Sequence, residues 1–309
     1  MLTAALFLVG FVILVKGADF LIDGARSVAR AVGVSPWVIG LTIVGIGTSI
    51  PELSIALFAN FVGEADIALG TIFGSNTYNL LIIGGLAAAI SPLVMEKKWV
   101  AIDLVINIAA VLLVAIIGYD GITRLEAGIL LALMVGWVIF ITRAEKDVKP
   151  ADGESSRVLT LPIAILLIVA GVAGVYLGGR WIVDGAVAFA RFAGVSEALI
   201  SLTAVAIGTS LPELSVSLRA AARGNAAIAV GNIIGSNIFD FLGIVGIMGL
   251  VRPFTVSGFL ITDVLVTFSA TILVLLFALF GKKYIISRKE GILMAALYLV
   301  YFVFLFVRG

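Results

Sequence analysis

Apolar segments of roughly twenty residues recur from one end of this chain to the other, and they constrain its fold more than any other feature. About 20 consecutive apolar residues are needed for a helix to span the hydrocarbon core of a bilayer. The sequence is 62% hydrophobic and only 13% charged, whereas a soluble domain carries about 25% charged residues. The sequence therefore predicts an all-α integral protein of the cell membrane that crosses the bilayer many times.

The apolar pattern predicts ten transmembrane helices. The first segment lacks a basic stretch and a cleavage site, so we interpret it as a membrane helix and not as a removed signal peptide. The first and sixth segments are longer than a perpendicular crossing requires, so we expect them to be tilted. The predicted spans are residues 2–30, 36–60, 66–90, 97–118, 123–142, 158–192, 196–221, 226–250, 257–281 and 288–307.

Residues 23–79 are repeated at residues 184–240, offset by 161 positions and without a gap. Roughly half of the paired positions are identical, so chance is a poor explanation. Because each half holds five spans, the second half is predicted to be inverted in the membrane. Inverted repeats are a recurrent architecture of secondary transporters, which bind substrate near mid-membrane at the repeat interface. The predicted divisions are a five-helix repeat at 1–142, a linker at 143–157 and an inverted five-helix repeat at 158–309.

The distribution of basic residues predicts the orientation of the chain. Of the 20 Lys and Arg residues, 14 fall on one side of the predicted spans, 4 on the other and 2 inside spans. Cytoplasmic loops carry the excess of basic residues. We therefore expect the 143–157 linker in the cytoplasm and both termini outside the cell.

Each copy of the repeat places acidic, amide and hydroxyl side chains inside apolar segments. An acid at the centre of a membrane helix costs about 2.5–3.5 kcal/mol, so such residues face the protein interior and need partners there. The second, third, seventh and eighth predicted spans have no Lys or Arg at matching depth, which leaves a mobile cation as the counter-charge. The stretches are Gly47-Thr48-Ser49-Ile50-Pro51-Glu52 with Gly74-Ser75-Asn76-Thr77-Tyr78-Asn79, and Gly208-Thr209-Ser210-Leu211-Pro212-Glu213 with Gly235-Ser236-Asn237-Ile238-Phe239-Asp240.

The residue types in these stretches favour a hard cation. Pro51 and Pro212 each remove a backbone donor and free carbonyl oxygens in the preceding turn. Surroundings made of oxygen atoms with several carboxylates suit Ca²⁺ above all, and also Na⁺. The sequence contains no Cys and no His, which removes thiolate and imidazole metal ligands and most hydrolase chemistry. We therefore expect no enzymatic activity.

The duplicated motifs, Gly-Thr-Ser-x-Pro-Glu paired with Gly-Ser-Asn-x-x-Asn/Asp, resemble those of the cation/Ca²⁺ exchanger superfamily, and most closely its prokaryotic sodium/calcium exchanger branch. The resemblance covers nearly the whole chain. It implies an antiporter that exchanges Na⁺ for Ca²⁺ by alternating access, with both ions competing for one mid-membrane site. It also implies that helices 2, 3, 7 and 8 are broken around that site, and that the long first and sixth helices slide over the rest.

The resemblance assigns roles to twelve residues, and these roles are expectations. The implied ligands are Glu52 and Glu213 as the main Ca²⁺ carboxylates with Thr48 and Thr209, Asn79 and Asp240 at the central position, and Ser49, Ser75, Ser210, Ser236 and the backbone oxygens of Gly45 and Ala206 around flanking Na⁺ positions. The family often has Ala where this chain has Gly45, which should matter little where only a backbone oxygen is used. Asn76 and Asn237 are expected either to orient the broken helices or to bind the ion directly.

The expected partners are Ca²⁺, Na⁺ and the lipid bilayer, with no cofactor beyond the transported ions, no nucleic acid and no obligatory protein partner. Two rival functions remain open. A Ca²⁺/H⁺ antiporter would use the same carboxylates, although proton-coupled relatives typically carry Gly-Asn-x-x-Glu where this chain has Gly-Thr-Ser-x-Pro-Glu. A cation channel would share the oxygens but would leak.

Other charged residues in the spans have simpler interpretations. Residues three or four positions apart share a helix face and can form ion pairs. Two such structural pairs are predicted, and two further acids are expected at helix starts or at the membrane interface. The pairs are Lys16 with Asp19 and Arg180 with Asp184, and the acids are Asp103 and Asp263.

Overall fold

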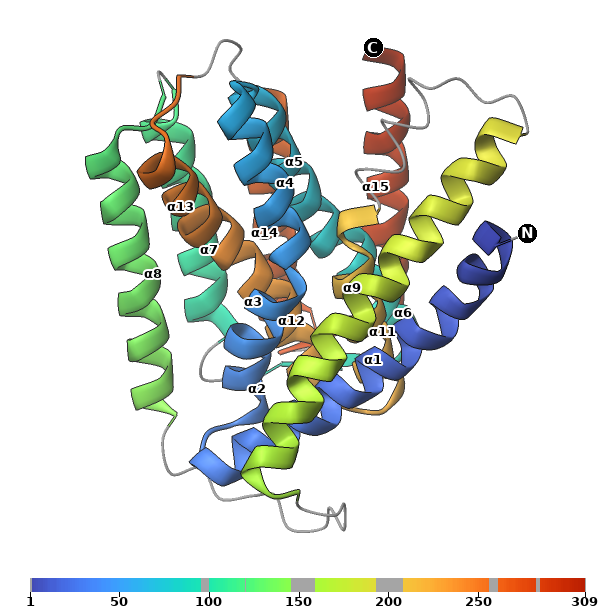
Figure 1. Cartoon of the computed structure of the whole chain (residues 1–309). Helices are drawn as coiled ribbons and strands as arrows, with labels where there is room; N and C mark the ends of the chain where they lie inside the picture. Colours follow the sequence, from blue (N-terminus) through green and yellow to red (C-terminus); the bar gives the residue numbers. More distant parts are fainter. Residues whose placement is uncertain are drawn as a thin grey trace.

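The computed structural model describes residues 2–95, 100–119, 121–145, 159–192, 208–255, 261–281 and 284–308. These residues are nearly all helical, as the apolar segments predict. The chain starts and ends in the upper part of Figure 1, whereas α8 ends and α9 begins in the lower part. The helices that frame the bundle are α1 (Leu2–Val32), α7 (Val100–Ile117), α8 (Arg124–Ala144), α9 (Leu161–Phe192), α14 (Ile261–Phe280) and α15 (Arg288–Arg308).

The two longest helices, α1 and α9, lie side by side and are inclined to α8 (Figure 1). Glycines line their contact. A Cβ on Gly17 would lie 2.7 Å from the backbone nitrogen of Val175, and one on Gly178 would lie 2.6 Å from that of Leu14. Small residues let membrane helices approach this closely. At 31 and 32 residues, both helices are as long as expected for the first and sixth spans.

The second predicted span bends in its middle, as expected from its proline. Its two parts, Pro36–Thr48 and Ile50–Val62, meet at an angle of 47°. Ser49 lies between them, and Pro51 occupies the first turn of the second part, where a missing backbone donor is tolerated. The elements along this span are α2 (Pro36–Ile39), the π-helix η1 (Gly40–Val44), α3 (Gly45–Thr48) and α4 (Ile50–Val62).

The third and eighth spans differ from the prediction that they are broken. Both run continuously, over Ala65–Ile90 and Ala226–Val251. Each contains one π-helical segment, in which wider i→i+5 bonds replace the α-helical ones and keep the helix intact. The prediction was wrong because a π-helical turn disturbs the helix locally without interrupting it. The elements are α5 (Ala65–Tyr78), η2 (Asn79–Ile83) and α6 (Gly84–Ile90), then α12 (Ala226–Ile238), η3 (Phe239–Ile244) and α13 (Val245–Val251).

Around these spans, α11 (Leu211–Ala222) follows Ser210, and most of the preceding part of the seventh predicted span lies outside the described residues. Two short strands, β1 (Leu93–Val94) and β2 (Ile285–Ile286), form an antiparallel pair in which Leu93 faces Ile286. This pair was not expected in an all-α chain. It joins the segment after α6 to the segment before α15.

The outer surface is suited to lipid. Large apolar side chains are exposed on the outer helices, for example Phe58 on α4, Ile116 on α7 and Leu125 on α8, which are 69%, 72% and 75% exposed. By length and hydropathy, five helical stretches among the described residues can cross a membrane, and the bent pair makes a sixth. In contrast, 89% of the apolar window in Ala226–Val251 is buried inside the protein. This span therefore forms the centre of the bundle.

Candidate cation site

Two helix N-termini present their acids to the centre of the protein. Glu52 is the third residue of α4 and Glu213 the third residue of α11, each directly after a proline. Both side chains are buried, with at most 1% exposed. The first turn of a helix carries a partial positive charge that stabilises a carboxylate. The Pro-Glu pattern thus places one buried acid from each repeat at the start of a helix.

The serines that precede these helices reach across to the opposite repeat. A serine at a helix N-cap usually accepts a bond from its own first turn, yet Ser49 and Ser210 make no side-chain cap. Ser49 instead donates to Glu213 Oε1 at 3.2 Å. Ser210 donates to Glu52 Oε1 at 3.3 Å. The serine of each repeat therefore lies against the glutamate of the other repeat and donates a hydrogen bond to its carboxylate.

The threonines of the motif follow the same crossed pattern. Thr48 lies beside the Glu213 carboxylate and Thr209 beside that of Glu52. Thr48 Oγ1 is 3.2 Å from the backbone oxygen of Gly45. Thr209 Oγ1, in contrast, has no well-formed hydrogen bond within the described part of the chain. Both threonine oxygens are close to the acids that they were predicted to assist.

Asn79 and Asp240 lie at the π-helical segments of the third and eighth spans. Asn79 is the first residue of η2, and Asp240 is the second residue of η3. Asn76 donates to Asp240 Oδ2 at 2.9 Å. Asn79 donates to Asn237 Oδ1 at 3.1 Å. Asn76 and Asn237 therefore each contact the central residue of the opposite repeat, and direct binding of the ion by either one stays a prediction.

The remaining predicted ligands that lie within the described residues are also buried. Ser75 donates to the backbone oxygen of Ile72 at 3.2 Å, and Ser236 donates to that of Asn232. Gly45 is buried, and a Cβ there would lie 2.8 Å from the backbone nitrogen of Ser236. The expectation that its identity matters little was wrong, because a side chain would collide with α12. Ala206 lies outside the described residues.

The buried side chains leave several oxygens without a hydrogen-bond partner among the described residues. A buried polar atom without a partner costs about 1–3 kcal/mol, and it needs an explanation such as an ion. No ion pair joins these acids to a Lys or Arg in the described ranges. The oxygens concerned are Glu52 Oε2, Glu213 Oε2, Asp240 Oδ1, Asn76 Oδ1, Asn79 Oδ1 and Thr209 Oγ1.

Carboxylates alone do not make this site. No three Asp, Glu, His or Cys side chains within the described residues are close enough to hold a metal ion by themselves. Any ion bound here must also use amide, hydroxyl and backbone oxygens. Such a mixed set with few charges can bind and release a hard cation, since affinity for Ca²⁺ follows the number of charged ligands.

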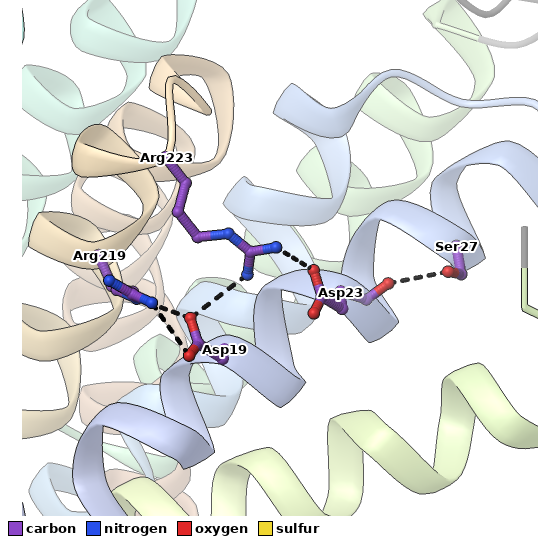
Figure 2. Close-up of polar contacts among 5 residues, drawn as sticks. All are labelled: Asp19, Asp23, Ser27, Arg219 and Arg223. Carbon is purple, nitrogen blue, oxygen red and sulfur yellow. Dashed lines mark hydrogen bonds and ion pairs between the residues drawn. The ribbon is translucent and has the colours of Figure 1, made fainter. Parts of the chain in front are cut away.

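Sequence reasoning missed an ion-pair cluster between α1 and α11 (Figure 2). Arg219 binds Asp19 through Nε at 2.6 Å and Nη2 at 3.2 Å. Arg223 bridges Asp19 at 3.4 Å and Asp23 at 2.6 Å. The predicted pairing of Asp19 with Lys16 was wrong, because two arginines from another helix lie closer. The only signal in the sequence was a pair of acids four residues apart on one helix and a pair of arginines four residues apart on another.

The other predicted charged residues have mixed outcomes. Arg180 and Asp184 form the expected pair at 3.8 Å. Asp103 lies in the first turn of α7 but is fully buried, where it accepts bonds from the indoles of Trp37 at 2.9 Å and Trp137 at 3.3 Å. Of the two roles expected for Asp103, the helix-start position is confirmed, whereas the interfacial role is wrong because two buried N–H donors hold the side chain inside the bundle.

Apolar helices around a group of buried acids, amides and hydroxyls are typical of a membrane transporter for ions. The sequence matches the sodium/calcium exchanger protein family over residues 2–143 and 163–307. The chain belongs to this family.

Individual relatives agree with the family assignment. The chain is 32% identical to the sodium/calcium exchanger MaX1 of Methanosarcina acetivorans, with 97% of each chain covered. It is 35% identical to the putative antiporter CaxA of Alkalimonas amylolytica, with 99% of each covered. The solved structure of the sodium-calcium exchanger NCX_Mj, soaked with Na⁺ and Ca²⁺, superposes with a TM-score of 0.85 at 32% identity and covers 98% of both chains.

Proposed function

We propose that this chain is a secondary active antiporter that exchanges Na⁺ for Ca²⁺ by alternating access, with both ions competing for one site. The observation that carries the proposal is the set of buried oxygens without partners on Glu52, Glu213 and Asp240. They surround a position that has acids but no protein cation among the described residues. The family membership supports Na⁺ and Ca²⁺ as the two ions.

In this proposal the protein's own hydrogen bonds prepare the carboxylates for an ion. Ser49 and Ser210 each occupy one oxygen of the opposite glutamate and leave the other oxygen free. Ca²⁺ would bind the free oxygens of Glu52 and Glu213 with Thr48 and Thr209, and would be completed by Asn79 and Asp240. Na⁺ would use Ser49, Ser75, Ser210, Ser236 and the backbone oxygens of Gly45 and Ala206.

Competition follows because Na⁺ at the flanking positions would neutralise the same carboxylates of Glu52, Glu213 and Asp240 that Ca²⁺ would bind. An empty site would leave buried acids without a counter-charge, which is unfavourable in a membrane interior. The empty protein would therefore reorient slowly, whereas the Ca²⁺-bound and Na⁺-bound forms would reorient readily. Exchange then results because one ion must replace the other before the site changes sides.

The proposed topology has ten spans in two inverted repeats, with both termini outside the cell and the 143–157 linker in the cytoplasm. The placement of the chain ends opposite the α8–α9 connection supports an odd number of crossings in each half (Figure 1). The crossed Ser-to-Glu pairs also support an approximate twofold relation between the repeats. Substituted-cysteine labelling from either side of intact cells tests this topology, and the chain has no native Cys to interfere.

The test of the proposed function is ⁴⁵Ca²⁺ uptake into proteoliposomes that contain the full chain and are loaded with Na⁺, K⁺ or acid. Outward Na⁺ gradients should drive uptake, and Glu213→Gln should abolish it because that variant removes a carboxylate charge from the site. Uptake driven by acid loading alone would favour a Ca²⁺/H⁺ antiporter. Uptake that ignores every gradient, together with single-channel currents, would indicate a channel. Full activity of Glu213→Gln would refute the site.

A further inference from the structure

Asn232 connects more parts of the candidate site than any residue singled out from the sequence. It is fully buried on α12. Its Oδ1 accepts a bond from Thr48 Oγ1 at 3.0 Å, and its Nδ2 donates to Ser217 Oγ at 2.9 Å and to the backbone oxygen of Glu213 at 3.4 Å. Its backbone oxygen accepts the hydroxyl of Ser236. One side chain thus joins a threonine of the first repeat to the acid-bearing helix of the second.

This arrangement exists on one side of the site only. At the 161-residue offset, the counterpart of Asn232 is Thr71, whose hydroxyl bonds to the backbone oxygen of Ile67 in its own helix. Thr209, the counterpart of Thr48, has a hydroxyl without a hydrogen-bond partner among the described residues. The two threonines of the site therefore differ, because only Thr48 has an amide acceptor.

The single proton of the Thr48 hydroxyl has two acceptors in hydrogen-bond geometry, besides the Glu213 carboxylate that lies close to it. One is Asn232 Oδ1 at 3.0 Å and the other is the backbone oxygen of Gly45 at 3.2 Å. A proton directed to Asn232 points toward α12 and leaves the Gly45 oxygen, which already accepts the Ser49 backbone N–H at 3.2 Å, with a lone pair free for an ion. Without Asn232, the proton would be directed to the Gly45 oxygen or to the Glu213 carboxylate, and both are proposed ion ligands. A hydroxyl can donate only one hydrogen bond.

We propose that Asn232 is a positioning residue for the cation site, which accepts the Thr48 proton and thereby keeps the Thr48 and Gly45 oxygens available to the ion. The inference rests on the proposed function, since it assigns a partner to two of the proposed ligands. In this role Asn232 acts through Thr48 and is not assigned as an ion ligand, since its oxygen accepts the Thr48 proton and its nitrogen donates to Ser217.

Two substitutions test this role in the purified full chain. Asn232→Leu removes the acceptor while keeping the branch at Cγ, and Asn232→Ser is a smaller side chain that is too short to reach Thr48. The first readout is the Ca²⁺ concentration that gives half of the Ca²⁺-induced rise in Tm, which reports binding whatever the coupling ion. We expect this concentration to rise about tenfold in Asn232→Leu, equivalent to about 1.4 kcal/mol. Ser217→Ala is the matched control, since it removes the other side-chain partner and should change the value less than about twofold.

A double-mutant cycle distinguishes the proposed positioning of Thr48 from a merely structural role of Asn232. In a Thr48→Val background, Asn232→Leu should add less than about twofold, because the proton that Asn232 accepts is absent. Three results would overturn the proposal. The first is a full tenfold rise in the half-effective Ca²⁺ concentration in the Thr48→Val background, and the second is an unchanged concentration in a folded Asn232 variant. The third is unfolding of both Asn232 variants while Ser217→Ala stays folded. Failure of the proposed function is distinct from these results, because wild-type protein would then show no Na⁺-driven ⁴⁵Ca²⁺ uptake.

Discussion

Among the proposed side-chain ligands, the two repeats differ only at Asn79 and Asp240, and this difference reverses the direction of a hydrogen bond. Asn76 donates its amide to the Asp240 carboxylate, whereas Asn237 accepts from the amide of Asn79. Hydrogen bonds to a charged group contribute about 1.5–3 kcal/mol, and bonds between neutral groups about 0.5–1.5 kcal/mol. The two asparagines therefore occupy equivalent positions but support groups of different charge.

This difference predicts unequal effects for an otherwise matched pair of variants. Asn76→Leu removes a donor from a buried carboxylate, so we expect the half-saturating Ca²⁺ concentration for ⁴⁵Ca²⁺ uptake to rise more than about tenfold. Asn237→Leu removes a bond between two neutral amides and should raise it less than about tenfold. Equal effects, or a larger effect of Asn237→Leu, would contradict this assignment of charge at the site.

Some residues of the site could be predicted from the sequence, and others could not. Glu52, Glu213 and their serines were predictable, because the repeat copies each of them inside an apolar segment. Asn232 was not, because its counterpart is Thr71 and the comparison of the two copies therefore drew no attention to it. Its role depends on how closely α12 approaches Thr48, and that approach depends on tertiary packing.

At the scale of elements, the close approach of α12 to η1 depends on glycine. A Cβ on Gly235 would lie 2.1 Å from the backbone oxygen of Leu41, and one on Gly231 would lie 2.8 Å from that of Trp37. Backbone atoms cannot move aside as flexible side chains can. This contact brings the first repeat's bent span against the second repeat's central span, and it therefore sets the distance between Thr48 and Asn232.

Gly235→Ala should consequently be strongly destabilising. Overpacking a core costs about 1–3 kcal/mol, and here the obstacle is backbone. We expect a fall of several degrees in the Tm of the detergent-solubilised protein, together with weaker Ca²⁺ stabilisation. The control is Gly136→Ala on α8, where an added Cβ meets no described atom within 4 Å. That variant should be neutral or gain about 1 kcal/mol from higher helix propensity. Equal Tm values for the two variants would show that the contact is looser than described.

Element boundaries illustrate where prediction from sequence stops. The bend at Ser49 follows from Pro51, which the sequence displays directly. The π-helical segments at Asn79 and Asp240 have no such marker, since no proline lies within them or directly before them. Polar residues in an apolar span indicated a local irregularity, but they did not distinguish a widened turn from a broken helix.

At the scale of the whole molecule, the α1–α9 pair is attached to the site-bearing core by the ion-pair cluster. Arg219 and Arg223 lie on α11, the helix that begins beside Glu213, and they hold Asp19 and Asp23 on α1 (Figure 2). Isolated surface ion pairs contribute little, but bidentate geometry and a network of several charges make this one effective. Movement of α1 and α9 past α11 would have to break these bonds.

Asp19→Asn should therefore change the rate of transport and not the affinity for ions. The substitution weakens both arginine contacts of Asp19, and because we propose that the α1–α9 pair slides during alternating access, the barrier to sliding should fall. We expect the maximal rate of Na⁺-driven ⁴⁵Ca²⁺ uptake to rise about threefold, whereas the half-saturating Ca²⁺ concentration should change less than about twofold. The difference in maximal rate between Asp19→Asn and the wild type should shrink at about 1 M salt, because salt screens exposed charges. Arg180→Gln is the matched control, because it breaks an ion pair within α9 alone. An unchanged rate in stable Asp19→Asn protein, or the same change in Arg180→Gln, would show that the cluster does not restrain this movement.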